Sequence, residues 1–291
     1  MLARAFVALV RPRDWVKNTL VLAPLLFGAK LFEPGAVGRA ALAALAYCLA
    51  ASAGYVWNDL ADREADRRHP AKRKRPLASG AVAPRPALLL SVVLAAGALL
   101  FAWPLPAGVV GCLAASLALM AAYSLWLKRV AIVDVFAIGA FYVLRVLAGS
   151  FAVGVAASDW LLMATGLVAV FLGLCKRRHE LLLLGDAAAE HRAALGRYSG
   201  RFLDAAISLT TSTTLIAYLL YAVSPETVAK FGSRGMLASA PFVFYGLLRY
   251  LHLVYTEGRG GSPTELVATD PGVLAAAIGF AVACGLVIYS R

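Results

Sequence analysis

Long apolar stretches make up most of the chain, and short polar segments separate them. A run of about twenty apolar residues is long enough to cross the hydrocarbon core of a bilayer as a helix. Spans rich in Ala, Gly and Leu are expected to be helices, because isolated strands cannot satisfy their backbone groups in lipid. The pattern predicts nine spans, at about residues 18–32, 37–57, 86–103, 106–126, 131–153, 159–175, 204–223, 236–254 and 272–290. The predicted fold is therefore all-α: one polytopic membrane domain over residues 1–291, built as a bundle of nine transmembrane helices.

Composition agrees with this pattern and narrows the function classes. Of 291 residues, 61% are hydrophobic, and the mean hydropathy is +0.77. The net charge of +12 is typical of many nucleic-acid-binding proteins. Here, however, the basic residues lie in loops between apolar spans, where membrane topology explains them. We therefore expect no nucleic-acid partner.

The distribution of Lys and Arg predicts the orientation of the chain. Basic residues are enriched in cytoplasmic loops. If the N-terminus is cytoplasmic, most of the 28 Lys and Arg residues fall on the inner side. The polar loops at about 58–85 and 176–203 are then both cytoplasmic, and long polar loops are where function is expected. The sequence thus predicts a multi-pass protein of the plasma (inner) membrane with its active site facing the cytoplasm.

The first of these loops opens with the run NDLADREADRRHPAKRKRP. Asn58, Asp62 and Asp66 are four residues apart, so they share one face of a helix, and Asp59 flanks that face. We expect the second span to continue as a helix until Pro70 stops it. Stacked carboxylates repel one another unless a cation lies between them, and oxygen-rich acidic sites suit Mg²⁺. These four side chains are the predicted metal ligands.

Basic residues follow the acidic run. Lys72, Arg73 and Arg75 can hold phosphate oxygens, Arg as a fork and Lys as a point charge. Metal-binding carboxylates beside phosphate-binding cations indicate a diphosphate substrate. The alternative is a solvated loop whose basic residues set topology, with Asp62 and Asp66 paired to neighbouring arginines.

A second polar cluster follows the sixth span, in the sequence KRRHE. Lys176 and Glu180 are four residues apart and are expected to pair on one helix face. Lys176 and Arg177 form a candidate second phosphate-binding group at the same membrane level as the first. The alternative is a positive-inside stop after a span.

Other polar residues at this level suggest a cytoplasmic cavity. Tyr123 and Lys128 close the fourth span, Asp134 opens the fifth, and Lys17 precedes the first. Arg145 lies within a span, where a charge is costly and tends to face a cavity or a partner. Alternative interpretations are a structural pair with a buried acceptor for Arg145 and an interfacial anchor for Lys17.

The run N-D-x-x-D-x-x-x-D resembles the first Asp-rich motif of the UbiA superfamily of intramembrane prenyltransferases. That resemblance implies two Asp-rich motifs that bind the Mg²⁺–diphosphate of a prenyl donor. The first motif matches at Asn58, Asp62 and Asp66, and these are the residues that it implies are catalytic. Where the second motif would lie, this chain has Lys176 to Glu180 instead.

More closely, the chain resembles the decaprenyl-phosphate phosphoribosyltransferase branch of that superfamily. This resemblance implies that phosphoribosyl pyrophosphate is the donor and a polyprenyl (decaprenyl) phosphate the acceptor. The lipid phosphate would attack the anomeric carbon and release pyrophosphate, giving a precursor of arabinose donors for cell-wall polymers. The matching stretches are RPRDWVKN at 11–18, NDLADREADRRHPAKRKRPLASG at 58–80, YSLWLKRVAIVD at 123–134, LRVLAG at 144–149, CKRRHEL at 175–181 and SPTELVATD at 262–270.

The chemistry of the residues agrees with this branch. A donor with a diphosphate and a separate 5-phosphate needs one metal site and one further cationic pocket, and the two polar clusters supply these. A general base is not needed, because a phosphomonoester is already ionised near neutral pH. Two alternatives stay open: a UbiA-type transfer of a prenyl group to an aromatic acceptor, and a non-enzymatic lipid-binding or transport protein. The sequence does not indicate an oligomeric state.

Overall fold

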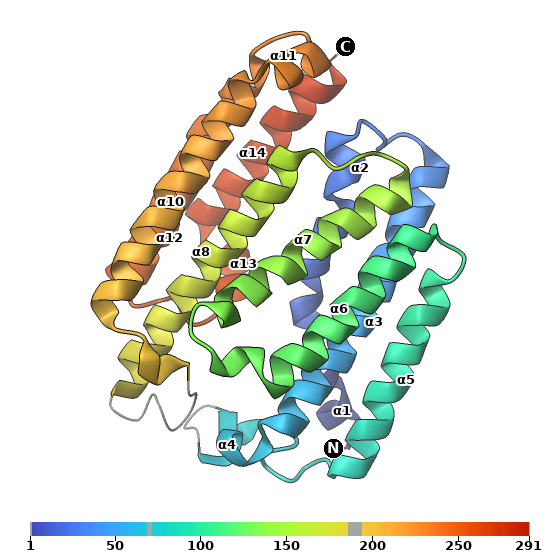
Figure 1. Ribbon diagram of the computed structural model, residues 1–291, viewed down its shortest axis with the longest axis vertical. Coiled ribbons are helices and arrows are strands. Elements are labelled where there is room, and N and C mark those ends of the chain that lie inside the picture. The colour runs from blue at the N-terminus through green and yellow to red at the C-terminus, as the bar shows by residue number, and fades with distance from the viewer. Residues whose placement is uncertain (1, 69–71, 186–193, 291) are drawn as a thin grey trace.

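The computed structural model describes residues 2–68, 72–185 and 194–290, and all regular structure within these ranges is helical (Figure 1). The longer helices give the frame, and short helices connect them at both ends. In chain order they are α1 (Leu2–Val10), η1 (Pro12–Leu22), α2 (Ala23–Phe27), α3 (Pro34–Ala61), α4 (Arg63–Arg68), η2 (Lys72–Lys74), α5 (Pro84–Ala102), α6 (Ala107–Leu125), η3 (Leu127–Arg129), α7 (Val133–Val153), α8 (Asp159–Leu184), η5 (Leu195–Arg197), α10 (Gly200–Val223), α11 (Pro225–Phe231), η6 (Gly235–Ser239), α12 (Ala240–Tyr255), α13 (Pro263–Thr269) and α14 (Pro271–Tyr289).

Eight helical segments in the described part of the chain are long and apolar enough to cross a membrane. They are α3, α5, α6, α7, α8, α10, α14 and the segment Gly235–Tyr255 formed by η6 and α12. They correspond to the second through ninth predicted spans. The all-α prediction is confirmed, but the count of nine spans is not.

The first predicted span, 18–32, is broken into η1 and the five-residue helix α2. Asn18 is buried against other helices rather than facing lipid, and Pro24 lacks the N–H that a continuous helix would use. Beyond α2 the backbone of Ala29 has a positive φ of 54°, which stops the helix. Hydropathy alone does not register these interruptions.

Two groups of helices pack side by side. In one group α3 packs against α5, α6 and α7 around an apolar core; in the other α8 packs against α10, and α12 against α14. The contact between α7 and α8 joins the groups, and Figure 1 shows these two helices running between them. The cavity described below lies at this junction.

A close backbone approach fixes η1 against the centre of the bundle. A methyl group at Gly149 would lie 2.0 Å from the carbonyl oxygen of Val21. Only glycine allows α7 to approach η1 this closely. One turn before Gly149, Arg145 therefore reaches the side chain of Asn18.

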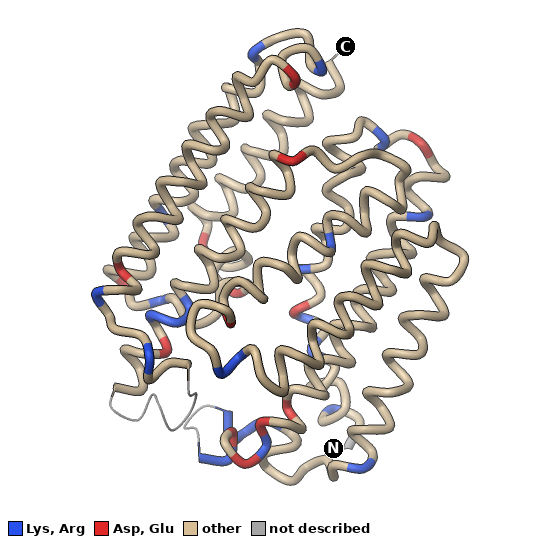
Figure 2. Tube along the Cα trace, in the orientation of Figure 1, with Lys and Arg blue, Asp and Glu red and all other residues tan. Residues whose placement is uncertain are grey.

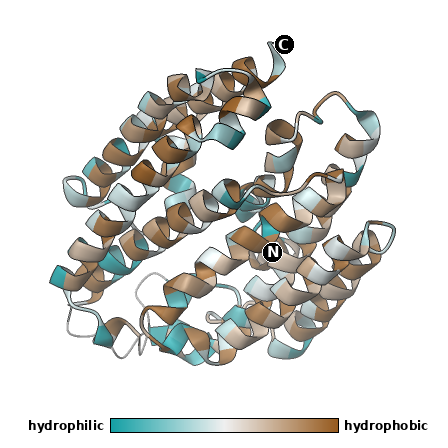
Figure 3. Cartoon of the chain, turned by 45° about the horizontal axis from the view of Figure 1, so that its top comes forward, coloured by the Kyte–Doolittle hydropathy of each residue, from teal (hydrophilic) through white to brown (hydrophobic). Residues whose placement is uncertain are grey.

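The outer surface carries many exposed apolar side chains, including Leu100, Leu209 and Leu286. Such a continuous apolar exterior is expected of a protein that is solvated by lipid. Charged residues gather mainly at the end that holds the N-terminus and α4 (Figure 2), and this end is also the more hydrophilic (Figure 3). The predicted polar loops thus meet at one end of the bundle, and the cytoplasmic orientation of that end stays a prediction.

Candidate active site

A cavity of about 290 Å³ lies between the two groups of helices. Its wall comes from η1, α3, η2, α6, α7, α8 and α13, so it gathers residues from almost the whole length of the chain. Ten of the residues predicted from the sequence line it: Lys17, Asn58, Asp62, Lys72, Arg75, Tyr123, Arg145, Lys176, Arg177 and Glu180.

The acidic wall begins at the end of α3. Asp62 interrupts the helix between α3 and α4, but its N–H still donates to Asn58 O at 2.9 Å, and the N–H of Asp66 donates to Asp62 O at 2.8 Å. The predicted spacing of one turn is therefore kept. Pro70, the predicted helix stop, lies outside the described residues.

Asn58 and Asp62 face the cavity as one polar unit. The Asn58 amide donates to Asp62 Oδ2 at 3.1 Å. Lys128, which is nearly buried on η3, donates to Asp62 Oδ1 at 2.5 Å and to Asn58 Oδ1 at 3.3 Å. Lys128 does not line the cavity itself, contrary to the expectation, and instead contacts these two residues from behind.

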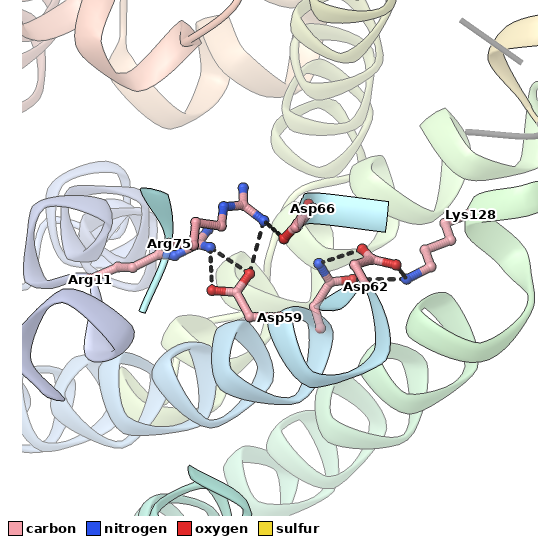
Figure 4. Close-up of polar contacts among 7 residues, drawn as sticks. Arg11, Asp59, Asp62, Asp66, Arg75 and Lys128 are labelled. Carbon is pink, nitrogen blue, oxygen red and sulfur yellow. Dashed lines mark hydrogen bonds and ion pairs between the residues drawn. The ribbon is translucent and has the colours of Figure 1, made fainter. Parts of the chain in front are cut away.

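Asp59 and Asp66 form a separate group with two arginines (Figure 4). Arg11 Nη2 donates to both carboxylate oxygens of Asp59, at 2.6 and 2.7 Å. Arg75 Nη1 bridges Asp59 at 2.9 Å and Asp66 at 2.7 Å. Both carboxylates are buried, and neither lines the cavity. Burial raises the pKa of Asp66 above its ordinary value, although the nearby Arg75 acts in the opposite direction.

The acidic run therefore offers the cavity one carboxylate and one amide rather than four ligands. Among the described residues no three Asp, Glu, His or Cys side chains are grouped closely enough to hold a metal ion by themselves. The oxygens of Asn58 and Asp62 nevertheless fit Mg²⁺, which commonly takes one or two protein oxygens and completes its shell with water and substrate phosphate.

Arg177 is the centre of the opposite wall. Its side chain is only 1% exposed, and Nε donates to Asp134 Oδ2 at 2.7 Å. Nη1 donates to Glu180 at 2.5 Å, and Nη2 donates to the Tyr123 hydroxyl at 3.3 Å. Asp134 is fully buried behind the guanidinium and does not line the cavity, contrary to the expectation. Glu180 thus pairs with Arg177, and the predicted pair of Glu180 with Lys176 stays a prediction.

The deepest charge is Arg145 on α7. Nε donates to the buried Asn18 at 2.8 Å, and Nη1 donates to Phe141 O at 2.8 Å. The guanidinium lies 5.4 Å from the centre of the Tyr142 ring and 6.0 Å from that of Tyr47. Both suggestions for Arg145 apply together, since it has structural partners and also lines the cavity.

Lys17 lies beside this group on η1. It pairs with Asp14 at 2.7 Å and lies 5.9 Å from the centre of the Tyr55 ring. Burial opposes its charge, but Tyr55 and Asp14 outweigh this effect, and the pKa of Lys17 is raised above its ordinary value. Lys17 therefore presents a permanent positive charge to the cavity at neutral pH.

A short connection between α12 and α14 covers part of the cavity. Pro263 and Thr264 at the start of α13 line it, and α13 contacts η1. The Gly260 N–H donates to Nδ1 of His179 at 3.4 Å, which fixes this connection to α8.

Several lining residues were not predicted as site residues. Arg11 contacts Asp59, while Tyr55 and Tyr142 lie beside the buried cations. The aromatic residues sit in apolar spans, where sequence alone does not separate a cavity wall from a packed core. Conversely, the predicted residue Arg73 is exposed on η2 and is not among the lining residues.

Comparison with known proteins places the chain in one family. A model described as "UbiA prenyltransferase family" matches residues 20–263. A decaprenyl-phosphate phosphoribosyltransferase of Mycobacterium tuberculosis H37Rv is 33% identical over 92% of this chain and 89% of its own length. The protein of the same name from Corynebacterium glutamicum is 32% identical over 92% of this chain and 82% of its own.

A solved structure has the same fold. A UbiA homologue from Archaeoglobus fulgidus, bound to GPP and Mg²⁺, superposes with a TM-score of 0.75 over 98% of this chain and 99% of its own. Its sequence is only 19% identical, so the likeness concerns the architecture alone.

Proposed function

Because this chain belongs to the UbiA prenyltransferase family, we propose that it is an intramembrane transferase whose donor is a sugar diphosphate. It transfers 5-phosphoribose from phosphoribosyl pyrophosphate to a polyprenyl phosphate, decaprenyl phosphate in the first instance, and releases pyrophosphate. The relatives that share about a third of its residues over most of the chain carry the name of this activity. The product would serve as a precursor of arabinose donors for the cell wall.

The asymmetry of the cavity carries this proposal. One wall presents Asn58 and Asp62, whereas the facing wall presents Lys176, Arg177 and one carboxylate, Glu180, which is paired with Arg177. A prenyl diphosphate held between two Asp-rich motifs would need carboxylates on both walls. A donor with a diphosphate at one end and a monophosphate at the other matches one metal-binding wall and one cationic wall.

Asn58 and Asp62 would hold Mg²⁺, which neutralises charge on the departing diphosphate. Asp66 remains a proposed ligand, which would reach the ion once its hydrogen bond with Arg75 is broken. Asp59 is a weaker candidate, because it is buried away from the cavity and holds the two arginines Arg11 and Arg75. We propose that Asp59 positions these arginines at the cavity wall.

The basic residues of the cavity fall into two groups, one proposed for each substrate. Lys72, Arg75 and Lys176 line the polar part of the cavity and would bind the donor phosphates, with Arg177 holding Glu180 near the ribose hydroxyls. Arg145, which donates to Phe141 O, and Lys17, which lies beside the Tyr55 ring, would bind the phosphate of the lipid.

The reaction needs no proton abstraction. An ionised oxygen of the lipid phosphate forms a bond to the anomeric carbon, while the bond from that carbon to pyrophosphate breaks and its electron pair leaves with pyrophosphate. The cations of the cavity stabilise the charge that develops on the leaving group. Because the donor is water-soluble, the charged end of the bundle would lie on the cytoplasmic side of the plasma membrane.

A direct test uses the purified protein with phosphoribosyl pyrophosphate, decaprenyl phosphate and Mg²⁺, and mass spectrometry of the lipid. The proposal expects a lipid that is heavier by one phosphoribosyl group. Asp62→Asn should abolish the product, whereas Asp159→Asn, a matched change of an exposed carboxylate at the start of α8, should not. An unmodified lipid, together with transfer of a prenyl group from a prenyl diphosphate to an aromatic acceptor, would overturn it.

A further inference from the structure

We infer that Tyr198 is a positioning residue that joins the two walls of the cavity through its hydroxyl group. This inference rests on the proposed function for its kinetic consequences, but its structural basis is independent. Tyr198 lies between η5 and α10, is buried, and is not among the residues that line the cavity. Any effect on the reaction must therefore pass through its neighbours.

The hydroxyl of Tyr198 makes two hydrogen bonds. It donates to Asp134 Oδ1 at 2.8 Å and accepts from the backbone N–H of Ile132 at 2.5 Å. The ring stacks on Phe202, with centroids 5.9 Å apart. The ring is thus fixed by packing, and the hydroxyl contacts two residues at the start of α7, Ile132 and Asp134, which lie about 65 residues earlier in the sequence.

The first of these two residues, Ile132, lies in a strained turn. Ile132 has φ 71° and ψ −51°, a region that β-branched residues rarely adopt. Its side chain is 49% exposed, so packing of that side chain does little to hold the conformation. Its carbonyl accepts from the N–H groups of Val135 and Phe136 within α7, so the bond from its N–H to Tyr198 is the restraint that comes from a distant part of the chain.

This turn carries the support of the acidic wall. Lys128 lies four residues before Ile132 and contacts both Asp62 and Asn58. The segment between them is short and has backbone hydrogen bonds at each end, from Val130 N–H to Leu127 O and from Asp134 N–H to Val130 O. A change of conformation at Ile132 would therefore shift Lys128 relative to α7.

The second residue, Asp134, supports the basic wall. Asp134 accepts from Tyr198 through one oxygen and from Arg177 through the other. Arg177 in turn holds Glu180 and Tyr123, which both line the cavity. One hydroxyl group thus restrains the residues behind both walls at once.

Tyr198→Phe tests this role, because it keeps the ring and removes only the hydroxyl. We expect kcat/KM for phosphoribosyl pyrophosphate to fall about 10- to 100-fold, the usual effect of removing an outer hydrogen bond that orients the residues of a binding site. The Mg²⁺ concentration at half-maximal rate should rise, because Lys128 no longer holds Asp62 in place. Hydrogen–deuterium exchange of the peptide 126–134 should accelerate, while exchange in α5 and α14 stays unchanged.

Tyr250→Phe is the matched control. Tyr250 lies in the same apolar cluster, and its buried hydroxyl has no hydrogen-bond partner among the described residues. The same chemical change there should leave both kinetics and exchange within twofold of the wild type.

A second variant separates positioning from general packing. Glycine adopts a positive φ at little cost, so adding Ile132→Gly to Tyr198→Phe should restore part of the Mg²⁺ dependence. It should not restore the KM for the donor, because the contact with Asp134 is still missing.

The inference is overturned if Tyr198→Phe matches Tyr250→Phe in kinetics and exchange, or if exchange rises over the whole protein rather than in 126–134. If the wild type makes no phosphoribosyl lipid, the proposed function fails, whereas the exchange of 126–134 still decides the structural claim.

Discussion

Replacing Arg177 with methionine removes the cation that two carboxylates share. Asp134 has a side-chain exposure of 0% and Glu180 of 13%, so neither can regain its full hydration. Breaking a buried ion pair from one side typically costs about 3–5 kcal/mol, because a buried charge is left without its partner. The Tyr198 hydroxyl still donates to Asp134, which favours the lower end of this range.

A loss of about 3 kcal/mol is large against the roughly 5–15 kcal/mol that stabilises most folded proteins. For a large domain it corresponds to a fall in the melting temperature of about 6–12 °C. Three of the four cysteines, all of them free, are buried, so a thiol-reactive fluorogenic dye in detergent micelles reports the unfolding directly.

Two further variants separate charge from packing. Arg178→Met removes the neighbouring arginine, which pairs with the 45% exposed Asp204 and lies 4.0 Å from the centre of the Tyr255 ring; a partly exposed pair of about 0.2–1 kcal/mol and a cation–π contact of about 0.5–1 kcal/mol give a smaller loss than Arg177→Met. Asp134→Asn combined with Arg177→Met removes one of the two unpaired carboxylates. It should recover much of the lost stability without recovering activity. The reasoning is refuted if the melting temperature of Arg177→Met lies within 2 °C of the wild-type value, which is about the effect of a surface pair. It is also refuted if the double variant is no more stable than Arg177→Met alone.

Two other predictions concern the acidic run and the packing of η1. Since the pKa of Asp66 is raised, protons compete with Mg²⁺ at a higher pH than for an ordinary Asp. The Mg²⁺ concentration at half-maximal rate should therefore rise as the pH falls through that raised pKa. Arg75→Gln removes the cation that favours the ionised carboxylate of Asp66, so in this variant the rise should begin at a still higher pH. Coinciding pH profiles of the wild type and the variant would contradict this prediction. Gly149→Ala should destabilise the protein by about 1–3 kcal/mol in the same dye assay, because its methyl group would meet Val21 O at 2.0 Å; Gly111→Ala, where nothing lies within 4 Å, should be neutral or stabilising.

Much of this fold follows from short-range sequence patterns. Apolar run length was sufficient for eight spans, because crossing lipid imposes it on every helix. It failed at 18–32, where η1 and the five-residue helix α2 end at Phe27 and Ala29 follows with a positive φ, a feature that an average over hydropathy does not detect. The spacing of Asn58 and Asp62 was likewise predictable, since it depends only on the period of one helix.

Contacts between distant segments were not predictable in this way. Asp59 shares the acidic run with Asp62, yet it pairs with Arg11, 48 residues away, and is turned from the cavity. Arg177 was expected to bind phosphate, but its partner Asp134 comes from a different helix. Tyr198 has no sequence signature, because its role depends on the turn at Ile132 that only the folded chain reveals.

The central claim is that the diphosphate belongs to the sugar donor. It departs as pyrophosphate, and its negative charge would be neutralised by the Mg²⁺ that Asn58 and Asp62 hold. The most direct measurement follows phosphoribosyl pyrophosphate that carries radiocarbon in the ribose and radiophosphorus in the terminal phosphate of its diphosphate. With decaprenyl phosphate and Mg²⁺, equal amounts of radiocarbon in the lipid and radiophosphorus in water-soluble pyrophosphate are predicted. Radiocarbon that stays entirely in the aqueous phase, with a folded protein that instead consumes a prenyl diphosphate, would contradict it.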